Sequence, residues 1–458
     1  MKKQMRLNAL DMNCVGGCPG LWLHPKDQTL GYNTLEYWTN LAQLLERGLF
    51  DSLFLADIFG VYDVYGGNAD AAFRNAVEFP VNDPFLLVPA MAMVTKNLGF
   101  GITGTATYEP PYSFARRLST LDHLTNGRIA WNIVTGYLDS AARAFGLREQ
   151  PKHDERYVLA EEFMEVVYKL WEGSWEDDAV VRDKVRGIFA HPEKIHKVRH
   201  EGKYFRMEGY HLCEPSPQRT PVLFQAGGSA RGRQFAAQHA ECVFISGSSP
   251  QVAAEIVSDL RGRARKLGRD PASLTIYAAL TVIAGETDGE AREKIADYQK
   301  HVSTEGSLAL LSGYLGMDFA SRNLDEPLER SEINAIQSCV QDFANSGPGR
   351  KYTLREAAAC MGVAAHKPLL TGSAKTVADG LMEWMEVSGI DGFNVEHIVC
   401  PADFEAFVDL VVPELQDRGV YKTRYEEGSL REKLNGKGKG RLPLDHPGAS
   451  YRFRAAGA

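Results

Sequence analysis

Short apolar runs alternate with helical patterns along almost the whole chain. Eight runs rich in Val, Ile, Leu and Phe predict β-strands at 5–11, 52–57, 99–105, 128–135, 221–227, 242–247, 274–284 and 392–397. Between them, apolar residues recur at intervals of three and four, which predicts helices at 35–47, 112–125, 157–171, 252–267 and 374–388. Continuously apolar strands are typical of a parallel sheet covered by helices. The pattern therefore predicts an α/β fold, a (β/α)8 TIM barrel.

Three long segments interrupt this repeat, and we expect a single barrel domain over 1–420 with insertions at about 58–84, 172–220 and 301–370. Loops of this length inside a compact domain usually carry function. The first follows the carboxyl end of a strand, where barrel active sites lie. With Phe59, Tyr62 and Tyr65 it is our candidate lid. The third insertion fits a lid and a surface elaboration equally well.

The chain ends in a basic, Gly-rich stretch, Gly436-Lys-Gly-Lys-Gly-Arg441. Such a sequence offers little to a hydrophobic core. We therefore expect residues 421–458 to form an extended C-terminal arm or a disordered terminus, and an arm of this kind could wrap a neighbouring subunit.

Charge and cysteine usage exclude several functions for the 458 residues. The formal net charge of -8 argues against nucleic acid or an anionic membrane as the main partner. No apolar run approaches the roughly 20 residues that span a bilayer, and no signal-peptide core follows the basic start. The seven cysteines are scattered and odd in number, so no disulfide framework is expected. A reducing, cytoplasmic location fits best.

A Gly-rich turn between a strand and a helix is the first candidate for binding chemistry. It is Gln225-Ala-Gly-Gly-Ser-Ala-Arg-Gly232. Glycines such as Gly228 allow close backbone approach, Ser229 adds a hydroxyl, and free amides at a helix start favour an anion. The turn lacks the G-x-G-x-x-G and Walker patterns. It therefore predicts a phosphate site, although a plain turn with an N-cap serine would have a similar sequence.

A second candidate opens the next long helix upstream, at His153-Asp-Glu-Arg-Tyr157. His153 and Tyr157 lie four residues apart, so both point from one face of the first turn. Asp154 is suited to cap the helix. A purely structural role, with a capping Asp and a solvated Arg, explains the pattern equally well.

Three predicted strands have polar residues near their carboxyl ends: Asp57, Thr103, and Asn132 to Thr135. Binding groups of barrel enzymes belong at these positions. A buried Asp must be paired or hydrogen-bonded, so Asp57 is either a loop organiser or a ligand contact.

Metal binding and acyl transfer are the two alternative chemistries. Cys14 and Cys18 have a spacing that suits zinc, but no second Cys/His pair follows them. His191, His196 and His200 lie in a charged insertion without a Cys or carboxylate frame, so we expect no metal site. Acyl transfer is disfavoured because the chain has no G-x-S-x-G elbow.

Six motifs in a fixed order resemble a known family, the luciferase-like flavin-dependent monooxygenases, in the branch that acts on nitrilotriacetate and dibenzothiophene sulfone. They are Phe54-Leu-Ala-Asp57, Thr107-Tyr-Glu-Pro-Pro-Tyr112, Leu121-Asp-His-Leu-Thr-Asn-Gly-Arg128, Trp131-Asn-Ile-Val-Thr135, His153-Asp-Glu-Arg-Tyr157 and Ala226-Gly-Gly-Ser-Ala-Arg-Gly232. Three further segments resemble the members that act on dimethyl sulfide most closely: 7–12, 169–178 and 213–220. The loop 13–20 departs from that pattern near the expected substrate side.

The resemblance implies a barrel that holds FMN at its C-terminal face. Asp57 and Thr103 would lie near the isoalloxazine and ribityl chain, while His153, Tyr157, Gly228 and Ser229 would hold the phosphate. It also implies reduced FMN (FMNH2) supplied by a separate reductase that uses NADH, O2 as co-substrate, and a homodimer or homotetramer.

The substrate class stays open at this stage. An organosulfur compound such as dimethyl sulfide, cleaved at a C–S bond, is the main expectation. The alternatives are C–N cleavage of an amine or aminopolycarboxylate, and deazaflavin-dependent hydride transfer on the same fold. No acid/base dyad is evident; His24 is the one candidate proton donor, and a packed loop histidine explains it better.

Overall fold

Eight parallel strands close into a barrel in the computed structural model, which describes residues 3–327, 352–364 and 367–453. The strands follow one another around the ring as β1 (Arg6–Met12), β2 (Ser52–Ala56), β3 (Gly99–Thr105), β4 (Ile129–Val134), β9 (Val222–Ala226), β10 (Cys242–Ile245), β11 (Thr275–Gly285) and β13 (Gly392–Glu396). Pairing of β1 with β13 and of β10 with β11 closes the ring. The predicted TIM barrel and all eight of its strands are confirmed.

Aromatic side chains fill part of the barrel interior. Phe54, Phe224, Phe244 and Tyr277 pack against one another there, and Phe224 and Phe244 stack with ring centroids 5.3 Å apart. A Cβ on Gly101 would lie 3.2 Å from the Phe54 ring, so the absence of a side chain makes room for this packing. The interior is thus a packed core below the mouth of the barrel.

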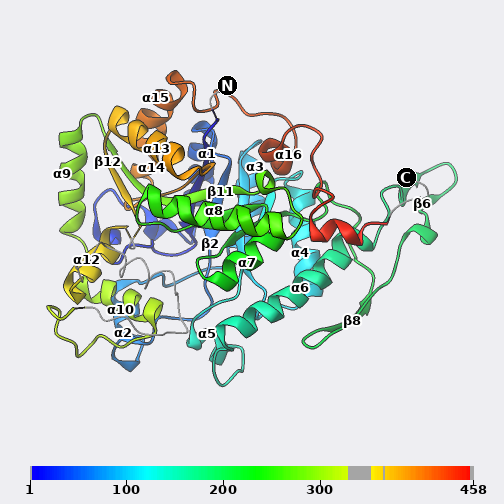
Figure 1. Ribbon diagram of the computed structural model, residues 1–458, viewed down its shortest axis with the longest axis horizontal. Coiled ribbons are helices and arrows are strands. Elements are labelled where there is room, and N and C mark those ends of the chain that lie inside the picture. The colour runs from blue at the N-terminus through cyan, green and yellow to red at the C-terminus, as the bar shows by residue number, and fades with distance from the viewer. Residues whose placement is uncertain (1–2, 328–351, 365–366, 454–458) are drawn as a thin grey trace.

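Helices surround the sheet on its outer side (Figure 1). They are α1 (Leu35–Arg47), α3 (Val88–Val94), α4 (Pro111–Leu124), α6 (His153–Gly173), α7 (Ala230–His239), α8 (Pro250–Lys266), α9 (Asp288–Gln299), α13 (Ala374–Ser388), α14 (Ala402–Ala406) and α15 (Val412–Asp417), with a π-helical turn at Phe407–Val411 between the last two. The short α5 (Asp139–Ala144) lies instead at the barrel mouth, where Ala141 lines the cavity. Each of the five predicted helices is present. None of the helices in the described ranges is long and apolar enough to cross a membrane.

The first and third insertions fold together beside the barrel mouth. The first contains α2 (Asp70–Asn75), and the third contains α10 (Thr304–Leu315) and α12 (Leu354–Ala364). Their apolar residues share one hydrophobic cluster, which includes Tyr62 and Leu310. The third insertion also runs into a strand that the sequence did not predict, β12 (Leu369–Ser373), which pairs with the end of β11 outside the ring.

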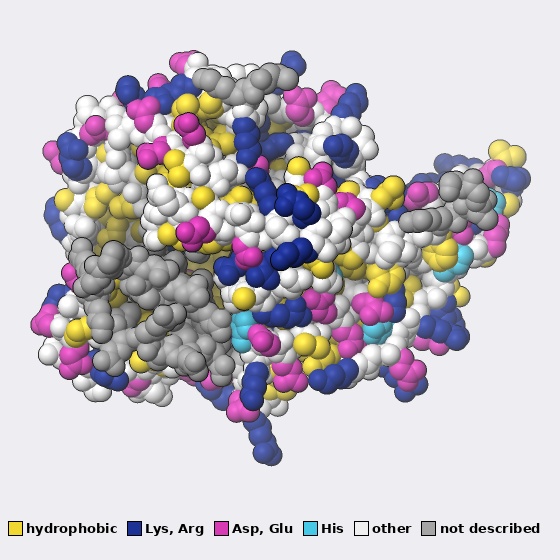
Figure 2. All heavy atoms as spheres, in the orientation of Figure 1, with side chains coloured by type: hydrophobic (Ala, Val, Ile, Leu, Met, Phe, Trp, Pro, Cys, Tyr) yellow, Lys and Arg dark blue, Asp and Glu magenta, His cyan; other side chains and the backbone are white. Residues whose placement is uncertain are grey.

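The second insertion forms two antiparallel hairpins, which were not predicted either. They are β5 (Val180–Asp183) with β6 (Ile188–Ala190), and β7 (Val198–Glu201) with β8 (Arg206–Gly209). Figure 2 shows part of this insertion projecting from the body of the molecule.

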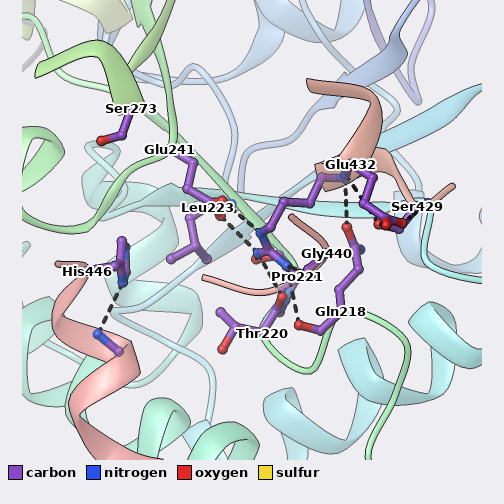
Figure 3. Close-up of polar contacts among 12 residues, drawn as sticks. Gln218, Thr220, Pro221, Leu223, Glu241, Ser273, Ser429, Glu432, Gly440 and His446 are labelled. Atoms are coloured by element: carbon purple, nitrogen blue, oxygen red, sulfur yellow. Dashed lines mark hydrogen bonds and ion pairs between the residues drawn. The ribbon is translucent and has the colours of Figure 1, made fainter. Parts of the chain in front are cut away.

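The C-terminal segment corrects the expectation of an extended arm. It contains α16 (Leu430–Asn435), whose Leu430 and Leu434 join the aromatic cluster inside the barrel. Arg431 is fully buried, with Glu241 at 2.7 Å and the carbonyl oxygens of Thr220 and Pro221 at 2.9 and 3.0 Å (Figure 3). These partners precede β9 and β10, so α16 closes the N-terminal end of the barrel.

Candidate active site

A cavity of about 390 Å³ opens at the carboxyl ends of the barrel strands. Ligand pockets of proteins usually have volumes of about 300–1,000 Å³. The residues predicted to form a binding site all line it: Asp57, Thr103, His153, Tyr157, Gly228 and Ser229. The sequence motifs thus meet at one place in the fold.

Two helices, α6 and α7, begin at one corner of this cavity, which we call the anion corner. The imidazole Nε2 of His153, the first residue of α6, lies 3.2 Å from the hydroxyl of Ser229, the N-cap of α7. Ser229 Oγ accepts a hydrogen bond from the amide of Gly232 at 2.9 Å, and the rings of His153 and Tyr157 meet edge to face at 5.2 Å. Because the N-termini of helices carry partial positive charge, this corner is suited to an anion.

The turn that enters α7 is narrow. A Cβ on Gly227 would lie 2.6 Å from Gln225 Oε1 and 2.7 Å from the carbonyl carbon of Gly232. Only glycine fits there, and the backbone at Gly228 therefore reaches the cavity directly.

Arg156 is a cavity residue that the sequence reasoning missed. The motif suggested a solvated Arg, but Arg156 is only 2% exposed and lines the cavity beside Tyr157. The positive charge of Arg156 adds to the partial positive charges of the two helix N-termini. The expected cap is also corrected: Lys152 is the N-cap of α6 and no side chain caps it, while Asp154 binds His153 Nδ1 at 2.7 Å.

Polar groups from three strand ends line the floor of the cavity. The Asn132 amide donates to Thr103 Oγ1 at 2.9 Å, which ties β3 to β4. Burial, together with the charges of Asp83 and Glu109, raises the pKa of Asp57 to about 8. Asp57 is therefore largely protonated at pH 7 and can donate a hydrogen bond.

Three residues that line the cavity have an acceptor without a partner among the described residues. These acceptors are the amide oxygens of Asn132, Gln225 and Asn394, each from a side chain that is at least 96% buried. Buried polar atoms are almost always satisfied, so each orphan needs an explanation such as a bound molecule.

A second group of polar residues, which no sequence motif predicted, lies away from the anion corner. Glu78, Lys367 and Glu396, which we call the polar wall, line the cavity together with Tyr137 and Tyr314. Lys367 Nζ lies 2.5 Å from Glu396 Oε2. Glu78 comes from the first insertion, Lys367 from the end of the third insertion just before β12, and Glu396 from the end of β13.

His24 lies outside the cavity lining. Its Nε2 lies 3.1 Å from Asp297, and its ring packs against Tyr298 and His301. The role as a packed loop histidine describes it better than that of a proton donor.

The residues of the metal alternative do not assemble within the described ranges. Two groups there have metal-ligand spacing, Asp11 with His397 and Cys400, and His24 with Asp297 and His301. Neither contains Cys14, Cys18 or the three histidines of the second insertion. Burial raises the pKa of the Cys18 thiol to about 12, and that of Cys14 well above its usual value.

Comparison with known proteins identifies the family. The model of the luciferase-like monooxygenases matches residues 19–392. The chain belongs to this family. It is therefore an enzyme of the monooxygenase class, as the six motifs predicted.

Two relatives match the chain almost end to end. Dimethyl-sulfide monooxygenase of Hyphomicrobium sulfonivorans is 49% identical over 99% of this chain and 94% of its own length; its crystal structure has a TM-score of 0.92 over 98% and 96% of the two chains. Long-chain alkane monooxygenase of Geobacillus thermodenitrificans strain NG80-2 is 50% identical over 99% of each chain; its crystal structure gives 0.91 over 99% of this chain and 100% of that one.

A third solved structure is that of a riboflavin lyase with modified FMN and riboflavin. It is 38% identical, covers 99% of this chain and 100% of its own, and has a TM-score of 0.93. The predicted branch is confirmed as well: dibenzothiophene-sulfone monooxygenase of Rhodococcus erythropolis, at 37% identity, covers 91% of this chain and 92% of its own length. Component A of nitrilotriacetate monooxygenase of Aminobacter aminovorans, at 35%, covers 94% and 96%.

Proposed function

We propose that the chain is the oxygenase of a two-component system that uses reduced FMN and O2. One oxygen atom enters a small organic substrate, the other leaves as water, and FMNH2 supplies two electrons as it becomes FMN. The proposed substrate is an organosulfur compound such as dimethyl sulfide, which breaks at a C–S bond. C–N cleavage in an amine is the alternative.

The convergence of two helix N-termini on one corner of the cavity carries this proposal. A phosphate there would meet the Ser229 hydroxyl, the Tyr157 hydroxyl, the His153 imidazole and the buried Arg156 guanidinium. The corner lacks the pattern that binds a dinucleotide, which favours FMN over FAD. The riboflavin lyase, whose structure contains modified FMN, supports the same cofactor.

The rest of the cavity also suits a flavin. The unpartnered amide oxygens of Asn132, Gln225 and Asn394 would accept from the N–H and hydroxyl groups that FMN offers. Asp57, with its raised pKa, would donate to a ring acceptor, and Thr103 lies beside Asn132.

FMN, when bound, supplies the redox chemistry, and the protein supplies position and shelter. Apolar side chains of Leu10, Phe54, Phe244 and Ile245 line the inner cavity and exclude water from it. Phe59 from the first insertion covers the mouth, where its ring packs against Tyr108 and Phe145. The role of this insertion as a lid is part of the proposal.

A separate NADH:FMN reductase is the partner we propose. A relative named as component A of a monooxygenase supports this arrangement. We also propose a homodimer or homotetramer. The six cysteines in the described ranges are free thiols, which is compatible with a cytoplasmic location.

Reconstitution tests the proposal. The purified chain is combined with a flavin reductase, NADH and FMN, and offered small sulfides, sulfones and aminopolycarboxylates. Substrate loss that depends on FMN and consumes O2 supports the proposal. Turnover with a reduced deazaflavin and no O2 consumption would replace it with the hydride-transfer alternative.

A further inference from the structure

The part of the cavity away from the anion corner is rich in carboxyl groups. Among the described lining residues outside that corner, Asp57, Glu78 and Glu396 are acidic and Lys367 alone is basic. Asp57 is largely protonated at pH 7, so the polar wall sets the local charge. Burial raises the pKa of Glu78, and the Tyr62 hydroxyl and the Lys367 ammonium oppose this rise. With Glu78 and Glu396 ionised beside one ammonium, the wall has a net charge of about -1.

Glu396 lines the cavity and has one carboxylate oxygen without a partner among the described residues. The residue is 8% exposed; its Oε2 binds Lys367, while the buried Oε1 accepts no hydrogen bond from any described residue. Glu396 is the last residue of β13, whose pairing with β1 and β11 fixes its position. An apolar substrate would leave this oxygen without a hydrogen bond. Such an unpaired buried group lowers binding affinity, which is why sites built for hydrogen bonding reject apolar analogues.

Tyrosine hydroxyls hold Glu78 on the same wall. Tyr62 Oη lies 2.6 Å from Glu78 Oε2 and 2.6 Å from Tyr137 Oη, and Tyr314 Oη lies 3.4 Å from Glu78 Oε1. The rings of Tyr137 and Tyr314 meet edge to face, with centroids 6.0 Å apart. Aromatic rings beside carboxylates favour a cation, because the ring faces are electron-rich.

The backbone at Glu78 points to function as well. Its φ is +46°, in the left-handed region that residues with a side chain rarely adopt. Such conformations persist where the surrounding structure enforces them, and they collect at binding sites.

We propose that the polar wall of Glu78, Lys367 and Glu396 selects a small substrate that carries a positive charge. The chemical class is a thioether or an amine with an ammonium group a few bonds from the atom that is oxidised. This narrows the proposed organosulfur class to its cationic members and makes neutral dimethyl sulfide a poorer substrate. The ammonium would donate to Glu396 Oε1 and neutralise the wall. This inference rests on the proposed function for the identity of the oxidised atom, but the recognition of charge is independent of flavin chemistry.

Binding of three matched probes to the full chain tests this selection. The probes are 2-(methylthio)ethylamine, which is cationic, methyl propyl sulfide, which is its neutral isostere, and 3-(methylthio)propionate, which is anionic. Binding is measured by calorimetry, once with FMN present and once without it. In at least one of these two conditions, the amine should bind at least tenfold more tightly than the neutral sulfide and the propionate. Equal affinities, or no binding of the amine in either state, would overturn the proposal.

Isosteric variants assign the effect to the wall. Glu396→Gln and Glu78→Gln should each weaken binding of the amine about tenfold and leave the neutral sulfide unchanged. Glu208→Gln, a carboxylate on β8 outside the cavity, is the control and should change neither. Equal losses for the cationic and neutral probes would mean that the wall is only structural.

Two failures remain distinguishable. A chain that prefers the cation but oxidises nothing with reduced FMN retains the polar wall as a cation site and loses the proposed function. A chain that oxidises the three probes equally well retains the function and loses the selection by charge.

Discussion

Replacing Ser229 with Ala removes a hydroxyl that we assign both to the α7 cap and to the FMN phosphate. The cap is visible: Ser229 Oγ accepts from the Gly232 amide at 2.9 Å. Loss of such a cap costs about 1 kcal/mol of folding stability. Loss of a hydrogen bond to a charged group costs about 1.5–3 kcal/mol, which corresponds to a roughly 10- to 150-fold weaker affinity for FMN.

Ser249→Ala is the matched control. Ser249 is the N-cap of α8, accepts from the Val252 amide at 3.3 Å, and does not line the cavity. Both variants should lose about 1 kcal/mol in urea unfolding. Only Ser229→Ala should weaken FMN binding.

The assay is titration of FMN fluorescence, with reduced FMN measured anaerobically by calorimetry. Tyr157→Phe, which removes a hydroxyl from the same corner and keeps Ser229 as the cap, should reproduce the loss of affinity. Unchanged flavin affinity in both Ser229→Ala and Tyr157→Phe would refute the assignment of the phosphate. Equal loss in Ser249→Ala would reduce the effect to one of stability.

Three further predictions concern titration, the closure of the barrel and assembly. Folded Asp57 keeps its proton up to about pH 8, whereas the unfolded chain loses it near pH 4, so the free energy of unfolding falls as pH rises between these values. Asp57→Asn should therefore raise the urea midpoint more at pH 8 than at pH 5. An equal rise at both pH values would contradict the raised pKa. Arg431→Ala should cost about 3–5 kcal/mol, since it leaves the buried carboxylate of Glu241 without its ionic partner. Arg441→Ala, at a more exposed site, should cost at most about 1 kcal/mol; similar losses in chemical unfolding would argue against α16 as the barrel closure. Light scattering at micromolar concentration should give the mass of a dimer or tetramer, and a monomer would contradict the proposed assembly.

The barrel was predictable because its strands are buried on both faces and stand out as continuous apolar runs. Hairpin strands such as Val180–Asp183 and Val198–Glu201 carry charged residues and are too short to show a pattern. The C-terminal segment was misjudged for a related reason. Its Gly-Lys repeat suggested disorder, while the residues that anchor it, Leu430, Arg431 and Leu434, span little more than one helical turn, which is too short for a clear pattern.

The candidate site was predictable where one motif combined several signals. The Gly-rich turn and the start of α6 each hold a helix N-terminus and polar residues within a few positions, so the anion corner followed from local sequence. The polar wall did not, because Glu78, Lys367 and Glu396 are isolated charges that only the tertiary fold brings together. Arg156 was missed because the residues next to an arginine in the sequence do not indicate whether its side chain is buried.

Incorporation of labelled oxygen tests the central proposal most directly. The purified chain is mixed anaerobically with photoreduced FMN and a substrate found in the reconstitution screen, without NADH or reductase, and 18O2 is then admitted. Any aldehyde product is reduced at once with borohydride, because a carbonyl oxygen exchanges with water. The proposal predicts a product with one 18O atom and oxidised FMN, and no product when NADH replaces the reduced flavin. Product without 18O, or substrate-dependent oxidation of NADH by the chain alone, would contradict it.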